Sequence, residues 1–204
     1  MEKNNVYEAK TKEEALNKAL KELNVTLEDI YYKEEFVEGK LFKSSKYIIT
    51  VIEKKQIKDI IIDFINNLSN NLNLNIETEI IEDNDIYNVL LVSDNNGILI
   101  GKDGKTLNSI QTMLRQLIKN QVDMTIKINL DVSNYKVKKL KRIERLVKGI
   151  AEDVEASQIT VSLDPMNSYE RRLVHTIIAE YPNLTTESVG EGKDRHVTIK
   201  YKEK

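Results

Sequence analysis

Apolar residues recur along the chain at two spacings, and the spacing predicts where helices and strands lie. Near the start, apolar positions three and four residues apart predict a helix that begins at Thr11, which forms a capping box with Glu14. Two strand-like runs follow, at residues 30–36 and 47–52. The first segment is therefore predicted to be a helix-plus-hairpin unit that ends in a charged joint at residues 53–55.

The middle of the chain carries a second set of elements. An amphipathic helix is predicted at residues 57–72, where the apolar positions form one broad face. The later elements are strands at 76–81 and 87–92, a short helix at 95–100, a helix over 107–118 and a strand at 124–132. The predicted order is therefore helix, strand, strand, helix, helix, strand.

The last third of the chain opens with a long helix at residues 135–155. It is followed by a strand at 159–163, a helix from Pro165 to Glu180, and strands at 184–189 and 195–201. We expect the α+β class, in three small domains at residues 1–54, 56–133 and 134–204.

Composition favours folded domains and limits their chemistry. Hydrophobic residues make up 40% of the 204, and the absence of cysteine excludes disulfides and thiolate metal sites. No run approaches the roughly 18 apolar residues of a membrane helix, and the first residues lack the apolar region of a secretory signal. We therefore expect a cytoplasmic protein that does not insert directly into a membrane.

The net charge of −2 is unevenly distributed. Residues 56–131 carry 6 basic and 11 acidic side chains, whereas residues 132–204 carry 14 basic and 11 acidic ones. Because phosphate binding draws on clustered Lys and Arg, any purely electrostatic contact with RNA is expected in the last third of the chain.

Two glycines separate the two helices predicted at 95–100 and 107–118. The pattern Gly-x-x-Gly on its own often marks a tight turn, but the order of the flanking elements resembles a KH domain, which clamps about four nucleotides with such a loop. A carboxylate inside the loop opposes phosphate by about 1 kcal/mol at ~4 Å in water. An apolar groove beside the loop is expected to receive bases. The candidate RNA-binding residues here are Ile100, Gly101, Lys102, Asp103, Gly104 and Lys105.

An arginine and a histidine share one face of the predicted helix that starts at Pro165. Arg171 and His175 are four residues apart and are expected to project from the domain together. Guanidinium binds phosphate in a bidentate manner, and imidazole stacks on a base or donates to phosphate. For an arbitrary helix, the simpler explanation of this spacing is a surface histidine that lies beside an arginine without a shared function. Arg172 and, in the closing hairpin, Arg195 are further candidate phosphate contacts.

The long helix at 135–155 is rich in cations. One interpretation is a solvated face whose long side chains cover apolar neighbours. Its position between two candidate RNA modules favours instead a phosphate-tracking surface with steep salt dependence. The candidate residues are Lys138, Lys139, Lys141, Arg142, Arg145 and Lys148.

These motifs together resemble the Jag family of SpoIIIJ-associated proteins, also called KhpB. Residues 98–111 are similar to the family's KH signature, and residues 157–202 resemble the domain named for its Arg-x-x-x-His motif. Residues 6–53 resemble the family's N-terminal domain, including the stretch at 39–43, where the family has a glycine in place of Lys43. The resemblance implies a helix-plus-hairpin domain, a type II-like KH domain and a single-stranded nucleic-acid-binding domain.

The resemblance also implies a function. Members are bacterial single-stranded RNA-binding proteins, regarded as RNA chaperones or post-transcriptional regulators linked to cell elongation and envelope homeostasis. It implies a small single-KH partner protein and leaves a homodimer open. The balanced charge of the N-terminal segment is typical of a protein-contact or ribosome-contact module.

Two other classes of protein compete with this interpretation. An enzyme is disfavoured because the chain has only two histidines and no cysteine, nucleotide loop or metal-ligand spacing, and its acidic run at 82–85 is typical of a turn. We therefore expect no cofactor, metal or small-molecule substrate. A scaffold is the stronger alternative, in which KH-mediated dimerisation, ribosome contact or membrane-insertase association leaves RNA binding weak or partner-dependent. Loss of RNA binding in Arg171→Ala and Lys102→Ala variants would favour the RNA-binding interpretation.

Overall fold

The computed structural model describes residues 5–39 and 44–202, in which helices and strands are mixed. The predicted α+β class is confirmed. The chain divides into two compact units, at residues 1–133 and 134–204. The separate domain boundary expected inside the first unit, between residues 54 and 56, stays a prediction.

A three-stranded antiparallel sheet begins the first unit. It comprises β1 (Asn5–Ala9), β2 (Ile30–Val37) and β3 (Lys46–Glu53) in the order β1-β3-β2, with α1 (Lys12–Leu23) against one face. Thr11 caps α1 as predicted, because its hydroxyl accepts from the Glu14 backbone N–H at 3.2 Å. Strand β1 was not predicted, since five residues are too short to show a period. Residues 40–43 of the family stretch lie outside the described residues.

The charged joint expected at residues 53–55 is not a linker. Strand β3 ends at Glu53 and α2 (Lys54–Leu72) begins at the next residue. The backbone N–H of Glu53 donates to Gln56 Oε1 at 3.2 Å, so this residue both ends the strand and caps the helix. The first sheet therefore ends within residues 53–55, where the sequence placed the joint, and the next helix follows without an intervening loop.

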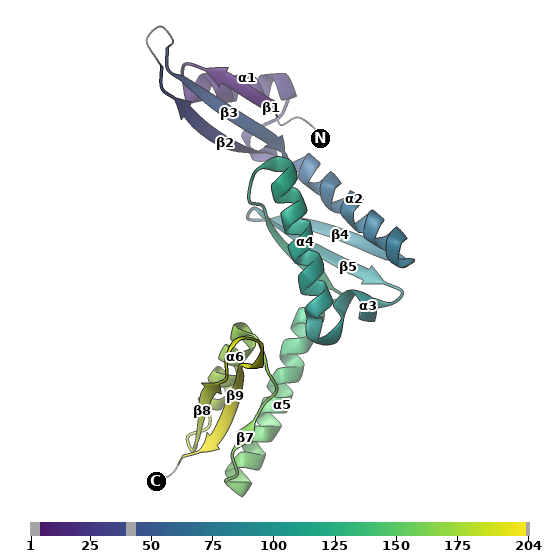
Figure 1. Cartoon of the computed structure of the whole chain (residues 1–204), viewed down its shortest axis with the longest axis vertical. Helices are drawn as coiled ribbons and strands as arrows, with labels where there is room; N and C mark the ends of the chain where they lie inside the picture. Colours follow the sequence, from purple (N-terminus) through teal and green to yellow (C-terminus); the bar gives the residue numbers. More distant parts are fainter. Residues whose placement is uncertain (1–4, 40–43, 203–204) are drawn as a thin grey trace. The chain divides into compact units, whose positions relative to one another are not determined.

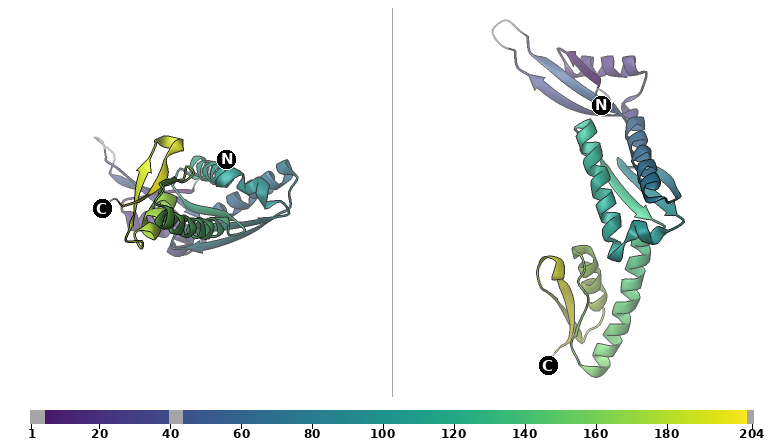
Figure 2. Two further views of the ribbon diagram at one scale, coloured as in Figure 1. Left: turned by 90° about the horizontal axis from the view of Figure 1, so that it is seen from below. Right: turned by 45° about the vertical axis from the view of Figure 1, so that its right-hand side comes forward.

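The second half of the first unit has the predicted element order. Helix α2 leads into β4 (Ile76–Asp83), β5 (Ile86–Ser93), α3 (Asn96–Ile100), the 3₁₀ turn η2 (Lys102–Gly104), α4 (Lys105–Val122) and β6 (Lys127–Val132). The sheet order is β4-β5-β6, and β6 runs parallel to β5 because the two helices α3 and α4 connect them. Helices α2 and α4 lie on the same face of this sheet (Figures 1 and 2).

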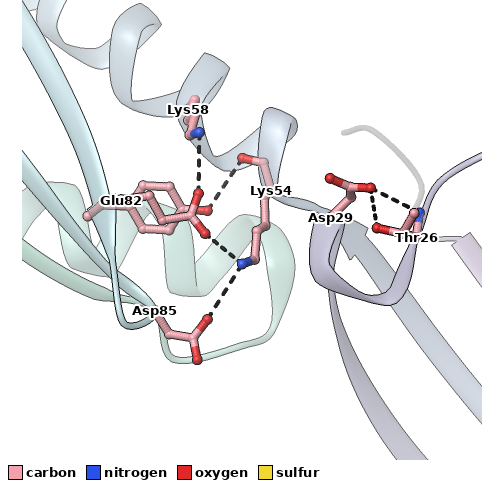
Figure 3. Close-up of polar contacts among 7 residues, drawn as sticks. Thr26, Asp29, Lys54, Lys58, Glu82 and Asp85 are labelled. Carbon is pink, nitrogen blue, oxygen red and sulfur yellow. Dashed lines mark hydrogen bonds and ion pairs between the residues drawn. The ribbon is translucent and has the colours of Figure 1, made fainter.

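A half-buried ion-pair cluster lies where α2 begins. Glu82 of β4 accepts from Lys54 Nζ at 2.6 Å and from Lys58 Nζ at 3.3 Å, and Asp85 lies 3.6 Å from Lys54 Nζ (Figure 3). Burial tends to raise the pKa of Glu82, but the hydrogen bonds from the two lysines outweigh it, so the pKa lies below its usual value. The cluster fixes the start of α2 against the β4–β5 hairpin.

The second unit packs two helices on a three-stranded antiparallel sheet. Its elements are α5 (Tyr135–Ser157), β7 (Val161–Ser162), α6 (Ser168–Ile178), β8 (Leu184–Val189), the 3₁₀ turn η3 (Gly192–Asp194) and β9 (His196–Tyr201), with sheet order β7-β9-β8. The core joins Val147 and Ala151 of α5 to Val174 of α6 and Ile199 of β9. Helix α6 begins at Ser168 rather than at Pro165, because Asn167 caps it.

None of the helices within residues 5–39 and 44–202 combines the length and apolar character needed to cross a bilayer.

Candidate nucleic-acid interface

The glycine loop between α3 and α4 requires a glycine at its first position. Gly101 has φ +67° and ψ −177°, a conformation that residues with a Cβ rarely adopt. A Cβ there would lie 2.0 Å from Thr106 Oγ1. The Gly101 N–H donates to the Gly97 carbonyl at 2.9 Å, which ends α3. The loop therefore reverses direction within a few residues, as a Gly-x-x-Gly clamp needs.

The side chains of the loop point to solvent at the start of α4. Lys102, Asp103 and Lys105 are exposed, and Gly104 is buried with φ +82°. Gly104 carries no side chain to cap α4, and the Lys105 N–H donates to the Lys102 carbonyl, while the start of α4 carries the positive end of the helix dipole. The predicted loop residues are thus brought together as cations around a helix start, with one carboxylate among them.

The flank of α4 next to β6 carries polar side chains, and the apolar groove expected beside the loop stays a prediction. Arg115 Nε donates to the Ile128 carbonyl at 3.0 Å, and the Leu130 N–H donates to Gln111 Oε1 at 2.8 Å. These two side chains satisfy backbone groups on the outer edge of β6. Neither residue was among the predicted candidates, because their role depends on which side of α4 faces the strand.

Arg171 and His175 are neighbours on α6, but they do not project freely as expected. His175 Nδ1 lies 2.7 Å from Thr186 Oγ1 and Nε2 lies 2.9 Å from Ser188 Oγ, so β8 hydroxyls engage both ring nitrogens. Arg171 Nη1 donates to the Met166 carbonyl at 2.9 Å. Both side chains are half-buried. Their first role is therefore to hold α6 against β8 and against the loop that precedes it.

Arg172 and Arg195 differ from this pair because both are exposed. Arg172 lies in the middle of the solvent-facing side of α6, between the half-buried Arg171 and Leu173. Arg195 follows η3, and its carbonyl accepts from the Met166 N–H at 3.1 Å. The hairpin and the start of α6 are thus tied together at the backbone, and two guanidinium groups remain on the surface.

Glu170 is a structural residue that the sequence motifs do not indicate. It is only 5% exposed, and its Oε2 accepts from the Asn167 N–H at 3.0 Å in a capping box. Its Oε1 pairs with Lys139 Nζ of α5 at 2.7 Å. Lys139 therefore belongs to the packing of α6 on α5 rather than to the phosphate-facing cations predicted for this helix.

The remaining predicted cations of α5 form a solvent-facing row. Lys138, Lys141, Arg145 and Lys148 are three, four and three residues apart, which places them on one side of the helix, and all are exposed. Lys148 pairs with Glu144 at 2.8 Å, and this hydrogen bond raises its pKa. Arg142, one turn beyond Lys138, is also exposed. Lys148 is set apart because it is paired with Glu144. We call the other four, Lys138, Lys141, Arg142 and Arg145, the α5 cation row, and within the described residues none of them forms an ion pair.

Comparison with known protein families identifies the class. Residues 58–136 match the KH domain of KhpA/KhpB. Residues 141–201 match the domain named for its Arg-x-x-x-His motif, which is the domain expected there from the sequence. The chain is therefore a protein that combines a KH domain with an Arg-x-x-x-His domain.

Curated relatives identify the family. The chain is 37% identical over 199 residues to the RNA-binding protein KhpB of Clostridium symbiosum, covering 95% of this chain and 90% of that protein. It is 32% identical over 107 residues to KhpB of Bacillus subtilis, covering 52% of this chain and 51% of the relative. KhpB of Lactiplantibacillus plantarum is 35% identical to the chain over 103 residues, which are 50% of this chain and 31% of the relative. The chain belongs to the KhpB family, and the resemblance predicted from its motifs is confirmed.

Proposed function

We propose that this RNA-binding protein of the KhpB family holds single-stranded RNA without catalysing a reaction, as an RNA chaperone or post-transcriptional regulator. The relatives are named RNA-binding proteins, and the KH and Arg-x-x-x-His domains both point to RNA. Within the described residues, His, Asp and Glu side chains form no group of three suited to a metal ion.

The α5 cation row carries this proposal. Four exposed cations that form no ion pair within the described residues lie on one helix of the second unit, and Lys139 joins that helix to the start of α6, where Arg172 is exposed. Because each neutralised phosphate releases counterions, such a row binds a phosphate chain with little regard to sequence. The Gly101–Gly104 loop of the KH domain is the second proposed contact, made by backbone amides and Lys102.

Other parts of the proposed function rest on the family resemblance. We propose that the protein acts in the bacterial cytoplasm, is linked to cell elongation and envelope homeostasis, and binds a small single-KH partner protein. A homodimer is a further option. The assignment of residues 1–54 to an N-terminal protein-contact domain belongs to the same proposal.

The test is fluorescence anisotropy with a labelled single-stranded RNA of mixed sequence over a range of salt. The variant Lys141→Gln/Arg142→Gln/Arg145→Gln removes three cations of the row. We expect weaker binding, and a slope of log K against log salt that is smaller by about 0.7 per lost phosphate contact.

The matched control removes three exposed cations from α1 and from the connection between β1 and α1. Lys10→Gln/Lys18→Gln/Lys21→Gln changes the net charge by the same amount and is expected to bind nearly as wild type. Equal weakening in both variants would mean that only net charge matters. No binding by folded wild-type protein would contradict the proposal.

One observation favours a scaffold as the second candidate function. On the face of the β4-β5-β6 sheet opposite α2 and α4, Ile81, Leu90 and Val92 form an apolar strip, and Ile81 and Val92 are exposed. The strand register places Glu77 and Glu79 beside this strip, so it repels phosphate. A scaffold role predicts that Ile81→Ser/Val92→Ser changes self-association in sedimentation velocity and leaves RNA affinity intact. An unchanged sedimentation coefficient would exclude self-association through this face.

A further inference from the structure

An exposed aromatic ring stands at the start of α6, beside the proposed RNA-binding cations. Tyr169 is the second residue of the helix, and it is 66% exposed. It is absent from the apolar residues that pack against the core of the second unit. The ring therefore adds little to the core of the second unit and is accessible to a ligand.

The other strongly exposed rings of the described chain have partners, which Tyr169 lacks. Phe36 packs on Tyr47 with ring centroids 5.0 Å apart. Tyr32 lies under Lys12 Nζ at 5.3 Å from its centroid. Among the described residues, no ring or cation contact involves Tyr169. One face of this ring is therefore available for a flat ligand.

The charge around Tyr169 favours a nucleotide. Arg172 is three residues further along α6, so the two side chains are neighbours on the helix surface, about 5–6 Å apart at Cβ. The adjacent Glu170 does not repel phosphate strongly, because its carboxylate is buried and paired with Lys139. A cation next to a free aromatic ring can hold the phosphate of a nucleotide whose base lies on the ring.

We propose that Tyr169 and Arg172 form a base-stacking subsite, in which Tyr169 stacks on one base of single-stranded RNA and Arg172 binds an adjoining phosphate. The inference rests on the proposed function and adds a base contact to a surface that otherwise offers cations. It assigns the second unit a preference for unpaired RNA, because a base must leave a duplex before it can lie on a ring.

The test compares two RNA probes of equal length at low salt, one of mixed sequence and one in which base-free ribose replaces every nucleoside. Tyr169→Leu removes the ring and keeps apolar volume, and Tyr169→Phe keeps the ring. We expect Tyr169→Leu to weaken binding of the normal RNA about 5- to 140-fold, from the usual contribution of one stacked base. Tyr169→Phe should remain within about twofold of wild type, and wild type and Tyr169→Leu should bind the base-free probe equally.

Phe36→Leu is the matched control, because it removes an exposed ring from the first unit; it is expected to bind both probes as wild type. A 2-aminopurine placed in the RNA should lose fluorescence on binding to wild type and not on binding to Tyr169→Leu. Equal weakening of both probes by Tyr169→Leu, or no weakening, would overturn the stacking subsite while leaving RNA binding intact. Wild-type protein that binds neither probe would instead overturn the proposed function, and this inference with it.

Discussion

The buried ion pair between Glu170 and Lys139 offers a sharp test of how the second unit is held together. Glu170→Gln removes the charge but keeps an oxygen that can accept from the Asn167 N–H, so it isolates the contribution of the ion pair. The variant leaves the Lys139 ammonium, whose side chain is only 17% exposed, facing a neutral amide. Removing one partner of a fully buried pair costs about 3–5 kcal/mol. Because Lys139 keeps some contact with water, we expect a loss of about 2–3 kcal/mol.

The assay is hydrogen exchange of the full chain, read by mass spectrometry on peptides from α6 and β9. Glu187→Gln is the control, because Glu187 pairs with Lys200 at a similar distance, 2.8 Å, but on the surface of the same unit. Glu187→Gln is expected to leave exchange in both peptides nearly unchanged. The double variant Glu170→Gln/Lys139→Met should recover part of the loss, since the largely buried ammonium is removed together with the carboxylate. A loss of stability in Glu170→Gln no larger than in Glu187→Gln would show that the Glu170–Lys139 ion pair does not hold α6 against α5.

Three further variants test other parts of the structure. Gly101→Ala should destabilise the α3–α4 turn by about 1–3 kcal/mol, because residue 101 has a positive φ and a Cβ there would clash with Thr106. Faster hydrogen exchange in the peptide that covers this turn is the expected result, and unchanged exchange would contradict the prediction. The pKa of the Glu82 carboxyl is lowered in the folded protein by its hydrogen bonds to Lys54 and Lys58. The stabilisation of the folded state by these ion pairs is therefore fully present above the pKa of the unfolded chain, about 4.3, and is lost as pH falls through the lower pKa of the folded state. The advantage of wild type over Glu82→Gln in denaturant unfolding should therefore shrink in acid, and a constant difference would argue against the ion pair. His175→Ala should destabilise the second unit by about 1–2 kcal/mol through lost hydrogen bonds to β8, and RNA binding lost without any change in stability would point to direct contact instead.

Long periodic segments and the glycine loop could be predicted from the sequence. The helices that became α2, α4 and α5 each show many turns of one apolar face, and Gly101 and Gly104 mark the reversal between α3 and α4. Short elements could not be predicted in this way. Strand β7 has two residues, where a strand at 159–163 was expected, and its place depends on pairing with β9.

The residues of the candidate site could likewise be predicted only in part from the sequence. Spacing placed Arg171 and His175 on one helix face, but nothing local to α6 shows that the face lies against β8. The pairing of Glu170 with Lys139 joins positions on different helices, so only the packing of α6 on α5 reveals it. The capping box of Asn167 and Glu170 was visible in the sequence, and it would have moved the predicted start of α6 from Pro165 to Ser168.

The most direct measurement is photocrosslinking of the full-length protein to single-stranded RNA containing 4-thiouridine, with the crosslinked residues located by mass spectrometry. We expect crosslinks in the exposed face of α5, in the first turn of α6 around Tyr169, and in the Gly101–Gly104 loop. High salt should remove the α5 crosslinks first, because these contacts are electrostatic. Crosslinks confined to residues 5–39 and 44–53, or stable RNA binding with no crosslink in the second unit, would contradict this expectation.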